Sequence, residues 1–115
     1  MVEDLNIAKV LIEAFDNDET GILLWDQKDN ICFANKPMFT RFNDQNINYE
    51  IGQNFYSRMD KIKKTKMIPD KKVIERIKNY ENVKQSKKPS NFVVKGPTGR
   101  WIQIRDNFTP SGYVL

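Results

Sequence analysis

The stretch GILLWDQKDNICFAN, residues 21–35, holds two short apolar runs on either side of a polar cluster. Short runs rich in branched and aromatic residues favour β-strands, which we expect at residues 21–25 and 31–34. Between the runs, Asp29 and Asn30 tolerate the positive φ that a tight hairpin turn requires. The stretch therefore predicts a β-hairpin, and the asparagine that ends it is suited to cap a following helix.

A block of helices is expected after this hairpin. Pro37 suits the first turn of a short helix that would carry Met38, Phe39 and Phe42 inward. The most regular helical pattern of the chain covers residues 69–86. Its apolar face combines residues at helical spacing: Val73, Ile74, Ile77, Tyr80 and Val83.

Three further strands are expected near the C-terminus, over residues 91–95, 100–108 and 113–115. The connecting tetrapeptides GPTG (96–99) and TPSG (109–112) place Pro second and Gly fourth, which suits a type I turn. This order of elements predicts an α+β fold with the helices inserted in one block between the second and third strands.

The N-terminal segment has a helical pattern with an unusually broad apolar face, over residues 3–16. Exposing such a face on a monomer costs free energy, so we expect it to pack on a second copy or across the domain's own sheet. We divide the chain into this amphipathic helix, residues 1–17, and a domain over residues 18–115. The candidate dimer-interface residues are Leu5, Ile7, Ala8, Val10, Leu11 and Ala14.

The composition argues against enzymatic chemistry within this segment. Its 115 residues suffice for one domain, and they include no histidine and one cysteine, Cys32. The usual general base and the usual metal ligands are therefore missing, and carboxylates such as Asp26 and Glu75 have no nucleophile paired with them. We expect no catalytic residue and no metal site. A lone cysteine suits a reducing compartment and no apolar run could span a membrane, so we expect a cytoplasmic protein.

The net charge of +4 is unevenly distributed along the chain. Residues 1–50 carry ten acidic and four basic side chains, a balance of −6, whereas residues 58–88 carry twelve basic and four acidic ones, a balance of +8. A basic block can bind nucleic acid, but this one lacks the interleaved aromatic side chains of single-strand binders. We expect solvated helix faces and no nucleic-acid partner. A nucleic-acid-binding domain that uses residues 58–88 remains an alternative.

Six stretches, in this order, resemble a PAS sensor domain. They are AF (14–15), GILLWD (21–26), ICFAN (31–35), YEIGQNF (49–55), GRWIQI (99–104) and GYV (112–114). The resemblance implies a five-stranded antiparallel sheet with helices inserted between strands two and three, plus the N-terminal amphipathic helix. Two features depart from the family pattern. Asn30 stands where Gly is common, and the chain stops at Leu115, within or just after the fifth strand, so we expect a piece excised from a larger protein.

The resemblance implies a regulatory module of bacterial-type signal transduction, as in two-component systems. Such modules dimerise, or bind a small ligand, and control an attached output domain such as a histidine kinase, a diguanylate cyclase or a nucleotide cyclase. The chain is then expected to form a homodimer and to bind a small molecule. The alternative is a structural dimerisation module whose core is filled and holds no ligand.

The resemblance also bears on cofactors. PAS members that hold haem through histidine need a residue that this chain lacks, and members that form a flavin–cysteinyl adduct carry an Asn-Cys-Arg-Phe motif on a middle helix. Cys32 lies instead on the expected second strand, where we interpret it as a small buried hydrophobe. We therefore predict no haem and no flavin adduct, which leaves a non-covalent small ligand.

Such a ligand would lie between the sheet and the middle helices, in a mostly apolar pocket. Gln103 and Arg105 are the polar candidates, and they share one strand face with Trp101, whose ring could stack on a planar ligand. The same apolar residues would also be needed for a filled core. The other candidates are Phe33, Phe39, Phe42, Ile51, Phe55, Met59, Ile74, Ile77, Phe92 and Val94.

Overall fold

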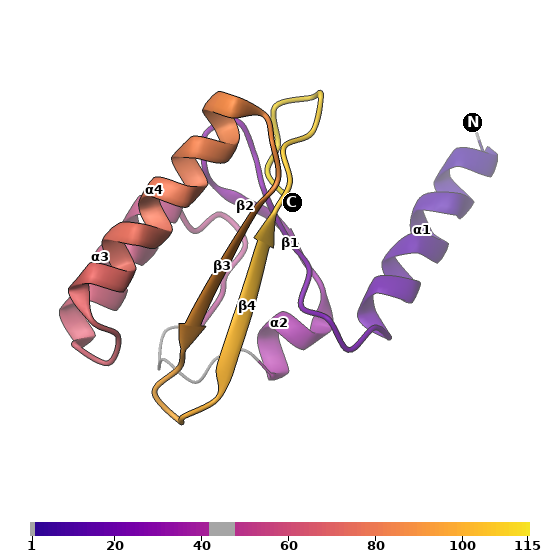
Figure 1. The fold of residues 1–115 in the computed structure, drawn as a ribbon. Helices are drawn as coiled ribbons and strands as arrows, with labels where there is room; N and C mark the ends of the chain where they lie inside the picture. Colours follow the sequence, from indigo (N-terminus) through magenta and orange to yellow (C-terminus); the bar gives the residue numbers. More distant parts are fainter. Residues whose placement is uncertain (1, 42–47) are drawn as a thin grey trace.

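The computed structural model describes residues 2–41 and 48–115 (Figure 1). Within these ranges the chain forms α1 (Val2–Asp16), β1 (Leu23–Trp25), β2 (Ile31–Ala34), α2 (Lys36–Thr40), α3 (Phe55–Thr65), α4 (Asp70–Ser86), β3 (Ser90–Lys95) and β4 (Trp101–Asp106). Strand β1 pairs with β2 and strand β3 pairs with β4, both antiparallel. The α+β class expected from the sequence is confirmed.

The single five-stranded sheet is wrong. The strands of the described residues form two separate two-stranded sheets, β1–β2 and β3–β4. The C-terminal segment, residues 113–115, makes isolated bridges in place of a ladder, and Val114 pairs with Trp25 on one side and with Phe108 on the other.

The helices do not pack together on one continuous sheet. Helix α4 packs on β3 and α3 packs on α4, whereas α2 lies beside α1. In Figure 1, α3 and α4 form a layer next to the β3–β4 sheet, and α1 stands away on the far side of the β1–β2 hairpin. The β1–β2 hairpin and the layer of α3 and α4 therefore contact each other through side chains of the core.

The core is centred on three aromatic rings from three elements. The rings of Phe55 and Tyr80 stack with their centroids 3.8 Å apart, and Trp25 meets the Phe55 ring edge-on at 5.2 Å. Further apolar side chains from both sheets, from α3 and α4, from the connection between these helices and from the C-terminal segment complete the core. They are Ile31, Met59, Ile62, Ile68, Val73, Val83, Phe92, Val94 and Val114.

The β1–β2 turn has the positive φ that its sequence predicts, but Asn35, which follows the hairpin, does not cap α2 with its side chain. Asp29 adopts a φ of 66°. The side chain of Asn35 makes no capping hydrogen bond to α2. Fully buried, it accepts the Ile22 N–H at 2.8 Å and donates to the carbonyls of Phe15 and Thr20 at 2.7 and 2.8 Å. Asn35 therefore ties the end of α1 to the hairpin.

Among the side chains expected in the interior, Phe39, Ile74 and Cys32 lie on the surface, and Phe39 is 42% exposed. Ile74 is 44% exposed, because the buried face of α4 is centred on Val73, Arg76 and Tyr80. Cys32 is exposed as well. Alternation along β2 places Ile31 inside and its neighbour Cys32 outside, so the interpretation of Cys32 as a buried hydrophobe is wrong.

Candidate functional site

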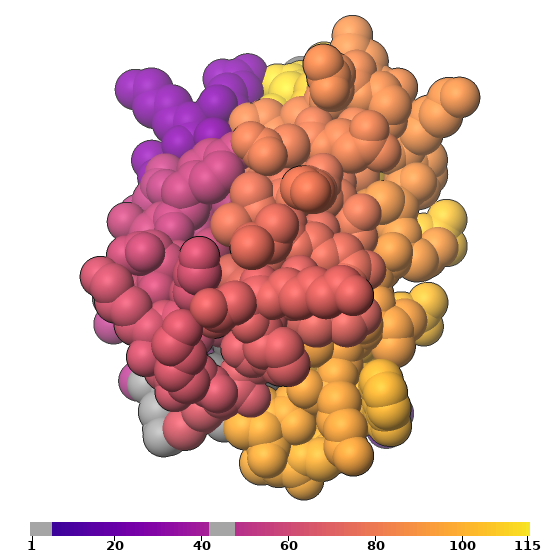
Figure 2. Space-filling view, turned by 60° about the vertical axis from the view of Figure 1, so that its left-hand side comes forward, coloured from indigo at the N-terminus to yellow at the C-terminus, as the bar shows by residue number. Residues whose placement is uncertain are grey.

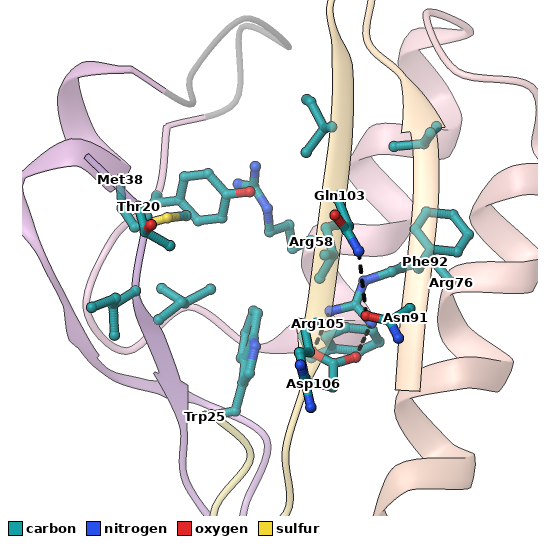
Figure 3. Close-up of a pocket in the computed structure, with 18 of the residues that line it drawn as sticks. Thr20, Trp25, Met38, Arg58, Arg76, Asn91, Phe92, Gln103, Arg105 and Asp106 are labelled. Atoms are coloured by element: carbon teal, nitrogen blue, oxygen red, sulfur yellow. Dashed lines mark hydrogen bonds and ion pairs between the residues drawn. The ribbon is translucent and has the colours of Figure 1, made fainter. Parts of the chain in front are cut away.

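A cavity of about 860 Å³ extends between the β1–β2 hairpin, α3 and the β3–β4 sheet (Figure 3). Its volume falls within the range of roughly 300–1,000 Å³ that small-molecule sites occupy. Most of the wall is apolar, and Trp25, Met38 and Phe92 are among the side chains that form it. The cavity is therefore large enough for a small organic ligand.

One charged side chain, Arg58, is buried in the cavity wall. Asn54 caps α3, because its side chain accepts hydrogen bonds from the N–H groups of Tyr56 and Ser57. Arg58 follows one turn later, on the same buried face of α3 as Phe55 and Ile62. Its side chain is 1% exposed and its guanidinium lies 3.6 Å from the centre of the Tyr49 ring. A cation over an aromatic face is stabilised by the ring quadrupole. Nη1 of Arg58 also donates to the Asn48 carbonyl at 3.4 Å and to Oε1 of Gln53 at 3.3 Å, so the buried guanidinium is held by groups of the protein.

A second buried charge in the wall is neutralised within the protein. Arg76 on α4 and Asp106 at the end of β4 form a two-pronged ion pair, in which Nη1 donates to Oδ2 and Nη2 donates to Oδ1, the latter at 3.2 Å. Both side chains are almost fully buried. A paired guanidinium fork satisfies the carboxylate with good geometry. We therefore interpret this pair as a connection between α4 and β4, and not as a group available to a ligand.

Burial raises the pKa of two tyrosines and of the cysteine. Burial, followed by the hydrogen bond to Asp29, raises the pKa of Tyr80. Burial, with the charge of Glu81, raises the pKa of Tyr56 to about 12. Burial, with the charge of Asp26, also raises the pKa of the Cys32 thiol, so this cysteine is no activated nucleophile. Among the described residues, no group of three or more His, Cys, Asp and Glu side chains could hold a metal ion.

The structure places part of the candidate pocket residues around this cavity. Those that line it are Phe55, Met59, Phe92, Val94, Trp101, Gln103 and Arg105. The last three are exposed side chains at its rim. Those that do not line it are Phe33 and Ile77, which are half-buried, and Phe39, Ile51 and Ile74, which are exposed. Phe42 lies outside the described residues.

Several cavity residues were missed by reasoning from the sequence alone, above all Arg58, Arg76 and Asp106. A signal for the two arginines was present, because each occupies an apolar stripe at helical spacing. Arg58 lies three residues after Phe55, and Arg76 lies three residues after Val73. A charged residue in such a stripe indicates a buried ion pair or a ligand contact.

Helix α1 carries the candidate dimer-interface residues, and it contacts little of the remaining chain. Ile7, Val10 and Leu11 are 59%, 60% and 48% exposed, and Ala8 and Ala14 are exposed too. The side chain of Leu5 lies outside the described part of the structure. Figure 1 shows α1 projecting from the body, with only its C-terminal end near α2. No helix of the described residues is both long enough and apolar enough to cross a membrane.

The basic block, residues 58–88, lies largely on the face that α3 and α4 form together (Figure 2). Part of its charge is balanced locally, since Lys64 pairs with Asp60 at 3.0 Å and Lys72 pairs with Glu75 at 3.3 Å. Exposed pairs of this kind are worth little energy, but they reduce the local positive potential. The face is therefore a mixed-charge helix surface.

Comparison with known proteins gives no match: no family model, no curated protein and no solved structure is similar to this chain at a significant level.

Proposed function

We propose that this chain is a regulatory module of the kind that the PAS resemblance implies. It self-associates through α1, holds a small and mostly apolar ligand in its cavity, and controls an output domain such as a histidine kinase, a diguanylate cyclase or a nucleotide cyclase. The observation that carries this proposal is the exposed apolar face of α1, which lies apart from the core.

The face of α1 suits a helix-to-helix contact. Ile7, Val10, Leu11 and Ala14 recur at spacings of three and four, so their side chains lie on one side of the helix. Large apolar side chains left in water are unfavourable, and the free energy gained on burial is proportional to the apolar area removed from water. The second copy of a symmetric dimer offers the same face, which makes this contact self-complementary.

The cavity supports a ligand-binding role in the same module. Its apolar wall favours a ligand with an apolar body. The ligand would contact both sheets, because Leu23 of β1 and Ile102 of β4 lie in the wall. Its binding would thus fix the position of one sheet relative to the other.

A path of hydrogen bonds supports coupling between the cavity and α1. Ile22 lines the cavity and donates its N–H to Asn35, which in turn donates to the Phe15 carbonyl at the end of α1. In addition, the N–H of Lys36 donates to Asp16 at 2.9 Å. A shift of the hairpin on ligand binding would therefore change the angle of α1 and the packing of two copies.

Measurement of the molar mass in solution tests self-association. We expect the chain to elute with twice its 13.6 kDa mass in size-exclusion chromatography with light scattering. Val10→Glu places a charge in the apolar face and should weaken the dimer about tenfold or more, because burying an unpaired charge is costly. Lys9→Glu is the matched control, since it changes charge on the opposite side of α1. A monomer at all concentrations, or equal effects of both substitutions, would overturn the proposal.

A further inference from the structure

The surface that α3 and α4 form together carries a surplus of positive charge. Residues 58–88 contain ten lysines and two arginines, Arg58 and Arg76. Both arginines are buried, whereas every one of the ten lysines is exposed or half-buried. The same residues include four acidic side chains, so the lysines exceed them by six. The positive charge at this surface is therefore carried by lysine.

Ion pairs within the protein neutralise part of this surplus and leave other lysines unpaired. Four of the ten lysines form such pairs: Lys64, Lys66, Lys72 and Lys84. Lys63 on α3, and Lys71 and Lys78 on α4, are exposed and form no ion pair with any described residue. These three ammonium groups are thus available to an anion outside the chain.

Two of the unpaired lysines flank an exposed apolar side chain on α4. Lys71 precedes Ile74 by three residues and Lys78 follows it by four. Residues at these spacings lie on one side of a helix, so the isoleucine lies between the two lysines. Ile74 is 44% exposed, and its apolar area in water costs free energy that burial would regain.

The third lysine, Lys63, reaches Ile74 from α3. The two helices lie side by side, and the short connection over residues 66–69 makes them antiparallel (Figure 1). Near the start of α3, the hydroxyl of Tyr56 donates to Glu81, near the end of α4. Seven residues, or two turns, bring a helix back to the same flank. Two turns onward from Tyr56 is Lys63, and two turns back from Glu81 is Ile74, so these two side chains lie next to each other.

The connection between the helices adds a second exposed apolar side chain. Lys66 ends α3 with a φ of 60°, and the chain turns there toward the start of α4. Of the next two residues, Ile68 is buried in the core and Met67 is 41% exposed. Figure 2 shows this end of α3 and α4 in its lower half. We define the basic–apolar patch as Lys63, Met67, Lys71, Ile74 and Lys78.

We propose that the basic–apolar patch binds the surface of a membrane that contains anionic lipids. Its lysines bind the negatively charged headgroups, and its two apolar side chains enter the boundary between headgroups and acyl chains. Each lysine close to an anionic lipid surface strengthens binding about fivefold. The inference goes beyond the proposed function, since it needs neither the apolar face of α1 nor the cavity.

Nucleic acid is another polyanion that a basic surface can bind, but the composition of the patch favours lipid. Nucleic-acid recognition commonly uses the guanidinium fork of arginine, or aromatic rings that stack on bases. The patch contains neither, because both arginines of residues 58–88 are buried. A phosphate backbone offers no apolar partner to Ile74 and Met67, whereas a lipid interface does.

Helix α1 also exposes apolar side chains, but its charge opposes binding to anionic lipid. It carries four acidic residues and a single basic one, Lys9. An anionic membrane repels such a helix at low salt. The attraction therefore depends on the face of α3 and α4.

Co-sedimentation of the whole 115-residue chain with lipid vesicles measures this binding. Vesicles of phosphatidylcholine with about one third phosphatidylserine supply the anionic surface, and pure phosphatidylcholine vesicles are the control. We expect binding to the anionic vesicles alone. Raising the salt from about 0.1 M to about 0.5 M should weaken it about tenfold or more, because salt screens charges. Absence of binding, equal binding to both kinds of vesicle, or tighter binding to duplex DNA than to anionic vesicles would overturn the proposal.

A charge-reversal pair tests whether the binding belongs to the patch. Lys71→Glu/Lys78→Glu reverses two of its charges and should weaken binding to the anionic vesicles about tenfold or more. Lys87→Glu/Lys88→Glu is the matched control, since it reverses two exposed lysines just beyond the other end of α4 and should matter by less than about threefold. Equal effects would show that binding follows net charge alone, which contradicts the patch.

An isoleucine pair tests the apolar part. Ile74→Ser removes the side chain at the centre of the patch and should weaken binding about fivefold or more. Ile51→Ser removes an isoleucine that is 60% exposed outside the patch and should leave binding unchanged. Equal effects would contradict the insertion of Ile74 into lipid. Should Lys71→Glu/Lys78→Glu fail to fold, this pair and the vesicle comparison on the unmodified chain still decide the question. Dimerisation through α1 is measured without lipid, so the two proposals fail separately.

Discussion

The hydroxyl of Tyr80 on α4 donates a 2.6 Å hydrogen bond to Oδ1 of Asp29 in the β1–β2 turn. The ammonium of Lys84, one turn further along α4, donates to the same oxygen. Because the Tyr80 ring also stacks on Phe55 in the core, this hydrogen bond holds the hairpin against the helical layer. It is a long-range contact between the β1–β2 turn and α4.

Removal of the Tyr80 hydroxyl should destabilise the fold. Tyr80→Phe keeps the stacked ring but deprives Asp29 of a donor in a partly buried place, which should cost about 1–2 kcal/mol in the free energy of unfolding. The control is Tyr56→Phe, whose hydroxyl bonds to the exposed Glu81 at 3.2 Å and should matter by less than about 0.5 kcal/mol. Urea denaturation followed by far-ultraviolet circular dichroism measures both, and equal losses would contradict the role given to the Asp29 contact.

The raised pKa of Tyr80 predicts loss of stability in alkali. In the unfolded chain the phenol ionises near its ordinary pKa of 10.0, whereas in the folded protein burial keeps it neutral. The stabilisation from this difference is complete below pH 10 and is lost as the pH rises from there towards the folded-state pKa. We expect the free energy of unfolding to fall more steeply above pH 10 in the unmodified chain than in Tyr80→Phe. Parallel curves would show that Tyr80 ionises normally in the folded state.

Removing one partner of the Arg76–Asp106 ion pair should lower the free energy of unfolding more than replacing both partners with apolar residues. Arg76→Met leaves the Asp106 carboxylate buried without its guanidinium partner, which should destabilise the fold by about 3–5 kcal/mol. The double variant Arg76→Met/Asp106→Leu should be more stable than the single one, because no buried charge is left. The exposed pair provides a control, in which Lys64→Met should change the unfolding free energy by less than about 1 kcal/mol. A double variant less stable than the single one would contradict this account.

Filling the cavity should reduce its capacity for apolar ligands. Val94 is 5% exposed and lines the cavity, whereas its neighbour Val93 is 48% exposed on the outer face of β3. We expect Val94→Phe to weaken binding of the fluorescent probe anilinonaphthalene sulfonate about tenfold, and Val93→Phe to leave it unchanged. Fluorescence titration measures both. If Val94→Phe binds the probe as tightly as the unmodified chain, the cavity is not the site of probe binding.

The local elements were largely predictable from the sequence. The strand expected at residues 31–34 is β2 (Ile31–Ala34), and the helix expected over 69–86 is α4 (Asp70–Ser86). The expected strand over 100–108 contains β4 (Trp101–Asp106). These elements depend on alternation, helical spacing and turn residues, which act between residues close together in the chain.

The composition of the cavity wall was less predictable. Because most pockets are lined by large apolar residues, the sequence predicts Phe55, Met59 and Phe92 in the wall. Arg58 and Arg76 occupy equivalent inward positions on their helices. Periodicity assigns a position to a face without specifying what lies opposite. The carboxylate of Asp106 beside Arg76 comes from a distant part of the chain, and the ring of Tyr49 reaches Arg58 from the segment before α3, which carries no helical period.

The amino-acid order alone determined where the hairpins turn, which helical faces are apolar, and that α1 presents more apolar surface than one short contact covers. Only the folded chain decided how the two hairpins are joined, because residues 113–115 bond to both without extending into a ladder between them. It also decided that Asn35 fastens α1 in place of capping α2, since the carbonyls of Phe15 and Thr20 reach its side chain only in three dimensions. Hydrogen bonds between distant segments depend on the distances that folding creates, and these distances are not encoded in any local spacing.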